Sequence, residues 1–317
     1  MQISRRHCLL WGAGLASGSL LGACATPSST KTVSSMGFFQ QQLGKARITA
    51  LSDGIGRRPL DAGFVKNAPL AQVQAALAAA NLPTTHIDVP YTCFVVELDG
   101  KRYLLDTGFA DNGAAGTGHL HQHMRAAGID PANIDAVIIS HMHGDHINGL
   151  RRKDGSLVYP KAKVHIPQDE AAFWLDDARM LALPESGRGG FQNARRVFKG
   201  YPRELIQLFK SGEDIAPGIS TLAAFGHSPG HTAIRVQSGS ERFTFIGDAA
   251  HLPVLFVKNP DWQVQFDMNP EQARITRHAL LARLAADKDW VGGYHFPLPA
   301  IGQLQKSGAG YEWVPRK

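Results

Sequence analysis

Residues 140–146 (SHMHGDH) carry four side chains that can bind metal ions. They follow residues 136–139 (AVII), an apolar run with β-branched residues that predicts a buried strand. Neutral imidazole and carboxylate are ligands that Zn²⁺ and similar ions take from proteins. One tight turn at the strand end can direct His141 and His143 toward one ion, and Asp145 and His146 toward a second. The alternative, a histidine-rich surface loop, does not require this spacing, so the segment predicts a metal site.

Three further ligand candidates also lie at the ends of predicted strands. His231 ends the segment GHSPGH and is the third imidazole expected on the first ion. Asp248 ends the segment FIGD, and its two carboxylate oxygens can bridge two cations. His295 ends WVGGYH and completes the second ligand set. A single histidine after a strand usually hydrogen-bonds to the backbone, but together with residues 140–146 these side chains indicate a two-metal centre.

The chain contains two similar series of strands and helices. Strands are predicted at residues 47–51, 91–98, 102–105, 136–140, 163–166, 220–224, 233–237, 242–246 and 290–294, and helices at 69–80, 117–127 and 271–286. A further helix carries Phe173 and Trp174, and residues 176–212 are expected to form a partly helical insertion. Two such halves, with ligand loops at strand ends, predict two sheets packed face to face with helices outside.

Residues 1–25 are predicted to be an export signal. Arg5 and Arg6 lie in SRRHCLL, which resembles a twin-arginine motif, and the Gly- and Ala-rich run that follows is short for a membrane span. Cleavage after Ala25 is preferred, with lipidation of Cys24 as the alternative. We expect a flexible tether over residues 26–37 and a folded domain over 38–317. The expected location is therefore the periplasm; a cytoplasmic protein with a chance Arg-Arg pair is the alternative.

The charge distribution argues against one class of binding partner, and the cysteine content argues against disulfide bonds. The net charge of the 317 residues is +6 at pH 7 without a clustered basic stripe, which argues against nucleic-acid binding. Of the three cysteines, only Cys93 lies outside the predicted leader, so no disulfide framework is expected. Membrane attachment would occur only through a lipidated Cys24, and a homodimer remains open.

The motifs HMHGDH, GHSPGH, GDAAH and YHFP together resemble the metal-binding motifs of the metallo-β-lactamase superfamily. The similarity runs through most of residues 38–317 and includes ITALSDG, LLDTG and AIGQLQKSGAGYEWVP. Within the superfamily the chain most resembles the methyl parathion hydrolase group, whose relatives include lactonases. The resemblance implies a four-layer αββα sandwich, an α/β fold with two mixed sheets flanked by helices and a dinuclear site at the edge of the sheets.

The resemblance also implies roles for individual residues. One metal would be held by His141, His143, His231 and Asp248, and the other by Asp145, His146, Asp248 and His295. Asp53 would orient a ligand imidazole; a turn aspartate beside Gly54 is the alternative. We expect two zinc ions, although nitrogen and oxygen ligands also suit cobalt, manganese or iron.

The implied chemistry is hydrolysis by a hydroxide that bridges two ions, with Asp145 and Asp248 as the catalytic carboxylates. The expected substrate is a small-molecule lactone, a carboxylic or aryl ester, or a phosphotriester. β-Lactam hydrolysis is one alternative, although the β-lactamases proper generally lack a bridging carboxylate such as Asp248. The other alternative is a non-catalytic periplasmic metal-binding protein.

Four residues are expected in the substrate pocket. The resemblance places Trp174 and Phe191 as aromatic pocket walls, with core packing as the alternative. Arg58 and His251 are expected beside the metals, where they would favour a lactone or carboxylic ester over an apolar phosphotriester. The alternative for Arg58 is a solvent-exposed guanidinium.

Overall fold

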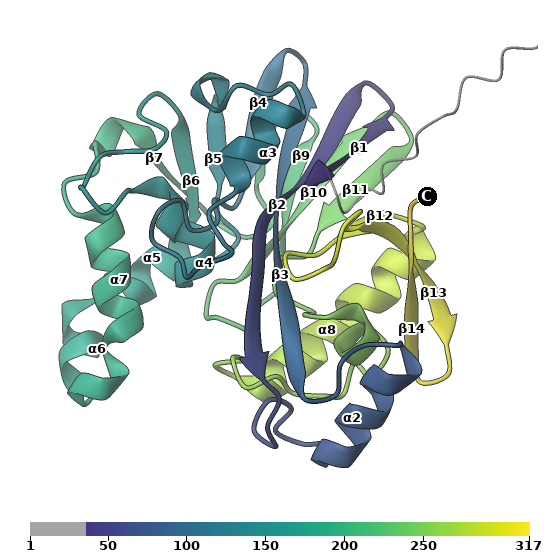
Figure 1. The fold of residues 1–317 in the computed structure, drawn as a ribbon. Helices are drawn as coiled ribbons and strands as arrows, with labels where there is room; N and C mark the ends of the chain where they lie inside the picture. The colour runs from purple at the N-terminus through teal and green to yellow at the C-terminus, as the bar shows by residue number, and fades with distance from the viewer. Residues whose placement is uncertain (1–35) are drawn as a thin grey trace, which may run out of the picture. The chain divides into compact units, whose positions relative to one another are not determined.

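The chain forms two mixed β-sheets with seven strands in each (Figure 1). The computed structural model describes residues 36–317. The first sheet contains, in spatial order, β1 (Phe38–Leu43), β2 (Ala46–Pro59), β3 (His86–Leu98), β4 (Lys101–Leu105), β5 (Ala136–Ile138), β6 (Lys163–Pro167) and β7 (Ile206–Phe209). The second contains β14 (Gly310–Pro315), β13 (Ile301–Ser307), β12 (Trp290–Gly292), β11 (Glu241–Phe245), β10 (Thr232–Ser238), β9 (Ile219–Ala223) and β8 (Asp214–Ala216).

Helices flank the sheets. They are α2 (Leu70–Ala79), α3 (Leu120–Ala126), α4 (Gly144–Ile147), α5 (Gln168–Trp174), α6 (Asp177–Ala182), α7 (Gly189–Phe198) and α8 (Pro270–Asp287), with a π-helical turn at Pro253–Val257. Helix α3 contacts β1 and β2, α5 contacts β6, and α8 contacts β13. The expected αββα sandwich of two mixed sheets is therefore confirmed.

Aromatic side chains join the two sheets. The ring centroid of Phe94 on β3 lies 5.3 Å from that of Phe243 and 5.2 Å from that of Phe245, both on β11. Gly292 on β12 faces the same rings, and a Cβ there would lie 2.7 Å from Phe243 and 2.8 Å from Phe94. A larger residue at this position would force the rings apart, because protein cores are close-packed.

The strand directions bring the loops of the site to one edge of the sandwich. In the first sheet, β4, β5 and β6 run parallel, so the segments that follow β4 and β5 leave the same edge. In the second sheet, β11 and β12 form a parallel pair, followed by Asp248 and His295 respectively. Parallel pairing thus collects side chains that lie far apart in the sequence.

Most predicted elements are present, and the missed ones lie mainly at sheet edges. Strands β1, β7, β8, β13 and β14 were not predicted, and β7 occupies the end of the segment expected to be a partly helical insertion. Edge strands such as β1 (FFQQQL) alternate poorly between apolar and polar residues, so their pattern is a weak signal. Helices α6 and α7 do lie within that insertion.

The predicted export signal and most of the tether lie outside the described residues. Within residues 36–317, no helix combines the length and the apolar character that a membrane crossing requires.

Candidate metal centre

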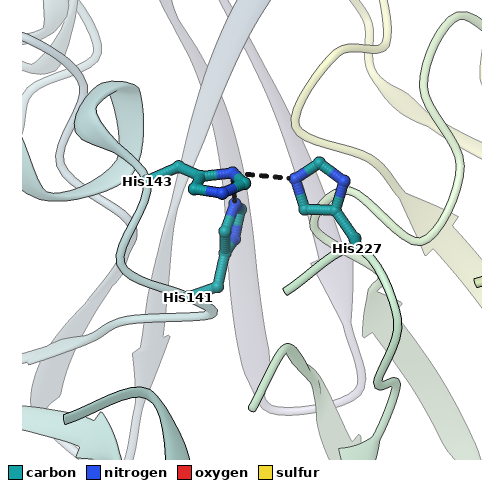
Figure 2. A group of neighbouring side chains, drawn as sticks. All are labelled: His141, His143 and His227. Atoms are coloured by element: carbon teal, nitrogen blue, oxygen red, sulfur yellow. Dashed lines mark hydrogen bonds between the residues drawn. The ribbon is translucent and has the colours of Figure 1, made fainter. Parts of the chain in front are cut away.

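Three histidines from two loops form the first cluster (Figure 2). His141 and His143 follow β5, and His227 lies in the loop between β9 and β10. The Nδ1 atom of His143 lies 3.0 Å from Nε2 of His141 and 3.0 Å from Nε2 of His227. These three nitrogens therefore point toward one another.

The hydrogen bonds of the opposite ring nitrogens indicate the tautomers of His141 and His227. His227 Nδ1 lies 3.0 Å from an oxygen of Asp267, to which it donates. Ser140 Oγ donates to Asp106, so it accepts from Nδ1 of His141 at 3.1 Å. Since each neutral imidazole carries one N–H, the Nε2 atoms of His141 and His227 present lone pairs. Two imidazole lone pairs thus converge near Nδ1 of His143, an arrangement suited to a cation.

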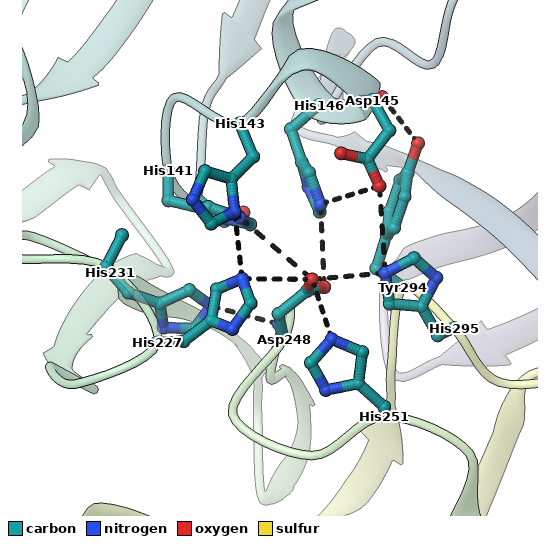
Figure 3. A network of polar contacts seen from close by, with 12 residues as sticks. His141, His143, Asp145, His146, His227, His231, Asp248, His251, Tyr294 and His295 are labelled. Atoms are coloured by element: carbon teal, nitrogen blue, oxygen red, sulfur yellow. Dashed lines mark hydrogen bonds and ion pairs between the residues drawn. The ribbon is translucent and has the colours of Figure 1, made fainter. Parts of the chain in front are cut away.

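Asp145, His146 and His295 form the second cluster (Figure 3). His146 Nδ1 donates to Asp106 at 2.7 Å, and His295 Nδ1 donates to the carbonyl oxygen of Pro90 at 2.9 Å. The Nε2 atoms of the two rings therefore face the Oδ2 atom of Asp145, at 3.4 Å and 3.7 Å. Two imidazole nitrogens and one carboxylate oxygen thus converge, and both are ligand types that divalent metals take from proteins.

Asp248 lies between the two clusters (Figure 3). Its Oδ1 is 3.5 Å from Nε2 of His146, and its Oδ2 is 3.1 Å from Nε2 of His295 and 3.3 Å from Nε2 of His227. Both Asp248 Oδ1 and His146 Nε2 are buried without a hydrogen-bond partner. Unpaired buried acceptors are costly, so the residues fit two divalent cations that share one carboxylate.

The electrostatics of the site favour positive charge. Burial alone would lower the pKa of His146, but the carboxylates of Asp145, Asp248 and Asp106 raise it well above its usual value. At the first cluster burial dominates and lowers the pKa of His143 to about 3, so this ring stays neutral and available as a ligand. The first cluster thus offers a neutral imidazole, and the second is surrounded by carboxylates; imidazole and carboxylate together are the ligand set expected for zinc and related metals.

The structure corrects one ligand assignment: His227 replaces His231 at the first cluster. Both ring nitrogens of His231 are already used. Its Nδ1 donates to the carbonyl oxygen of Ala224 at 3.0 Å, and its Nε2 accepts from the backbone N–H of Asp248 at 2.9 Å. His231 therefore has no free lone pair, and it holds Asp248 in place instead. The other predicted ligands are brought together.

Asp53 does not orient a ligand imidazole. Its carboxylate accepts hydrogen bonds from the backbone N–H groups of Phe109 and Leu120, at 2.9 Å and 3.0 Å, and burial raises its pKa to about 6. It therefore shapes the loop that carries Phe109. The orienting role falls to two residues that sequence reasoning missed, Asp106 and Asp267. Asp106 lies in the LLDTG motif, which could have identified it from the sequence. Asp267 lies in a loop that carries no recognisable motif.

Trp174 and Phe191 do not line the cavity beside the clusters. Their ring centroids lie 5.0 Å apart in a buried aromatic group with Phe173. The Trp174 ring lies edge-on to His143, with 5.6 Å between the centroids. Both residues are therefore packing residues, and Trp174 supports a ligand rather than the substrate.

A cavity of about 410 Å³ opens onto both clusters. Its walls are formed by Arg58, Phe64, Val89, Tyr91, Phe109, His143, Gly144, Asp145, Asn148, His227, Asp248, His251, Leu252, Phe266 and His295. Arg58 and His251 are thus among the residues that line this cavity. His251 stacks on His295 at 4.9 Å, and its Nε2 is 3.3 Å from Asp248. The neighbouring Arg57 points away and pairs with Asp88.

The metallo-beta-lactamase superfamily sequence model matches residues 87–295, two thirds of the chain and the whole range that contains the ligand candidates. The chain belongs to this superfamily. The match and the two clusters together indicate a dinuclear divalent metal site in a metallohydrolase fold.

Several known proteins resemble the chain in sequence. Integrator complex subunit 11 of Danio rerio is 26% identical over 172 residues, which span 51% of this chain but only 28% of the fish protein. An N-acyl homoserine lactonase of Bacillus thuringiensis is 22% identical over 192 residues, spanning 54% of this chain and 68% of the lactonase.

Two solved structures of the superfamily cover nearly the whole described domain. AidC, a dizinc quorum-quenching lactonase in complex with the product N-hexnoyl-L-homoserine, aligns with a TM-score of 0.83 and 26% identity. The hydrolase AbOPH aligns with a TM-score of 0.82 and 27% identity. Each alignment covers 89% of this chain and 98% of the other.

Proposed function

We propose that this protein is a dinuclear metal-dependent hydrolase that cleaves lactones or carboxylic esters. The observation that carries the proposal is the cavity, which is lined by residues of both ligand clusters, by an arginine with no ion-pair partner among the described residues, and by several apolar side chains. The similarity to lactonases supports the same reaction class.

The two carboxylate ligands have different roles in the proposed reaction. When bound, a pair of divalent ions lowers the pKa of water and polarises a carbonyl oxygen. Asp248 contacts the second cluster through both of its oxygens and the first cluster through Oδ2. The Asp145 side chain is 23% exposed, whereas that of Asp248 is 3% exposed, so Asp145 is the carboxylate that can exchange a proton with the cavity.

His251 is suited to contact the substrate. Burial lowers its pKa to about 4, so the ring is neutral at pH 7. Neither ring nitrogen has a hydrogen-bond partner within the described residues. A neutral imidazole beside Asp248 can therefore donate its N–H to an oxygen of the ester group.

The apolar lining of the cavity favours a substrate with an apolar part. Phe64, Val89, Phe109, Leu252 and Phe266 contribute apolar surface there. Burial of an acyl chain or similar group against them is favourable, at roughly 25 cal/mol per Å². The cavity volume of about 410 Å³ lies within the range usual for small-molecule sites.

Arg58 distinguishes between substrate classes. Its guanidinium lies 4.8 Å from the centroid of the Phe266 ring, and none of the described residues forms a hydrogen bond or ion pair with it. A lactone or ester with an additional carbonyl or anionic group can accept its N–H donors. A purely apolar phosphotriester would cover the guanidinium without replacing its hydrogen bonds to water, which is unfavourable.

The test is a substrate panel with parallel metal analysis. We expect an acyl lactone or a phenyl ester to have a higher kcat/KM than a phosphotriester or a cephalosporin. Arg58→Leu should lower kcat/KM for the preferred substrate by about 10- to 100-fold, the effect of one lost charge-assisted hydrogen bond. Arg57→Leu is the matched control, because that guanidinium pairs with Asp88 outside the cavity.

Other results would change the assignment. A phosphotriester as the best substrate, with no effect of Arg58→Leu, would refute the proposed pocket. A cephalosporin as the best substrate would favour β-lactam hydrolysis. Two bound metals without turnover of any of the four would favour a metal-binding protein.

A further inference from the structure

Glu170, on helix α5, is a buried carboxylate that belongs to neither ligand cluster. It accepts four hydrogen bonds, and none of the ion pairs formed by described residues involves it. One oxygen accepts from the backbone N–H of Met142 at 2.8 Å and from Nε1 of Trp174 at 2.9 Å. The other accepts from Ser228 Oγ and the N–H of Gly230, both at 2.6 Å.

These donors belong to the two loops that carry the first cluster. Met142 lies between His141 and His143, and Ser228 directly follows His227. The carboxylate therefore connects the loop after β5 to the loop before β10. Its fourth partner, Trp174, packs on the ring of His143.

The close approach of α5 to the loop before β10 depends on Gly230. A Cβ at this position would lie 2.6 Å from the backbone nitrogen of Glu170 and 2.9 Å from Cβ of Asp169. The absence of a side chain lets the loop contact the first turn of α5. Helix and loop are thus fitted to each other around one carboxylate.

The second cluster is held by different groups. His146 is oriented by Asp106, and His295 by the carbonyl oxygen of Pro90. Only the hydrogen bond from Met142 reaches the segment of residues 140–146, which also carries His146, and none reaches the segment that carries His295. A defect at Glu170 should therefore affect the two clusters unequally.

We infer that Glu170 is a positioning residue that sets the distance between the two histidine loops, and thereby the metal affinity of the cluster formed by His141, His143 and His227. This inference rests on the metal-dependent function proposed above. Helix α5 thereby has a role in the assembly of the site.

The variant Glu170→Gln keeps the shape of the side chain but changes the hydrogen bonds that it can accept. The amide has nearly the same volume but offers one acceptor oxygen and one NH₂ group. On the side of Met142 and Trp174, both partners can only donate, so the oxygen of the glutamine should take that side. The NH₂ group then faces Ser228, which can reverse its hydroxyl, and Gly230, which cannot. The loop that carries His227 should consequently move away.

The experiment is titration of the metal-free full-length protein with Zn²⁺ and with Co²⁺, followed by elemental analysis, visible absorption of the Co²⁺ form and thermal unfolding. The wild type should bind two equivalents. In Glu170→Gln, one equivalent should bind at least about tenfold more weakly, the range for loss of a group that orients a ligand. The other equivalent should keep its wild-type affinity.

Asp289→Asn is the matched control. Asp289 is also a buried carboxylate, and it accepts hydrogen bonds from Thr244 and Arg242 and pairs with Arg235, away from both clusters. This variant should lower Tm without changing either metal affinity. Ser228→Ala removes one of the four donors and keeps the charge, so it should weaken the same single equivalent by a smaller factor.

The outcomes test the positioning role of Glu170 separately from the proposed metal-dependent function. Wild-type metal affinities in Glu170→Gln, or equal weakening of both equivalents, would overturn the positioning role. If Glu170→Gln does not fold, the same two results in Ser228→Ala would overturn it. A wild type that binds no metal would instead refute the proposed function itself.

Discussion

At the scale of single residues, a buried histidine can bind a metal only if one of its two ring nitrogens is not already hydrogen-bonded within the protein. His227 and His231 belong to the same short loop, and both are buried. His227 uses one nitrogen on Asp267 and presents the other to the cluster. His231 uses both nitrogens on backbone groups. Burial alone therefore does not distinguish a ligand from a structural imidazole.

The two histidines should respond differently to substitution. We expect His227→Ala to lose one of two bound metals per chain, because a tripod of imidazoles becomes a pair. His231→Gln should retain both metals with at most about a tenfold weaker affinity, since the amide can still accept from the Asp248 N–H, in the manner of a group that orients a ligand. Elemental analysis after dialysis measures this difference; the opposite ranking would restore His231 as the ligand.

At the scale of elements, strand β2 both shapes and lines the cavity. Its pairing with β3 is irregular between Ser52 and Gly54, where Asp53 turns inward to bind the backbone of the loop that carries Phe109. Further along the strand, side chains alternate, so Arg57 faces Asp88 while Arg58 faces the cavity. One strand thus supplies a loop anchor and a specificity residue.

Gly54 is required by this irregularity. Its φ is +132°, a conformation that favours glycine, and a Cβ would overlap the carbonyl oxygen of Gly116. Gly54→Ala should lower the free energy of unfolding by about 2–3 kcal/mol and also reduce kcat/KM, because Phe109 would shift. Gly100→Ala is the control: its φ is +76°, but nothing lies within 4 Å of a Cβ, so the cost should be about 1 kcal/mol. Urea unfolding of both variants tests this; equal costs would contradict it.

At the scale of the whole molecule, a half-buried neutral imidazole makes stability depend on pH. His121 on α3 lies 2.9 Å from the hydroxyl of Tyr159, and burial, with smaller contributions from Arg152 and Arg125, lowers its pKa to about 4. Between pH 4 and about 6.5 the unfolded chain therefore binds a proton that the folded protein does not. The contribution of the neutral His121 ring to stability is therefore complete above pH 6.5 and is lost as the pH drops toward 4.

This contribution can be isolated with His121→Gln. In metal-free protein, the wild type should lose up to about 3 kcal/mol more than the variant between pH 7 and pH 4. His278→Gln, at an exposed ring paired with Asp261, serves as the control and should follow the wild type. Urea unfolding at several pH values measures the difference; identical pH profiles for wild type and His121→Gln would exclude a buried neutral His121.

The sequence by itself determined the fold class and most of the ligand candidates. Both depend on local features: apolar runs that form strands, and imidazoles or carboxylates directly after them. These features are readable because a strand and its following loop adopt their geometry within a few residues. The segment HMHGDH is the clearest case, and the match over residues 87–295 agrees with it.

Only the tertiary structure decided the hydrogen-bond partners of these ligands. The choice of His227 over His231 depends on Asp267 and on the N–H of Asp248, which come from other segments. The positions of Trp174 and Phe191 in the core, and the four bonds of Glu170, likewise arise from contacts between distant parts of the chain. A sequence states which donors and acceptors exist, but which of them meet is set by how the two sheets and the inserted helices pack.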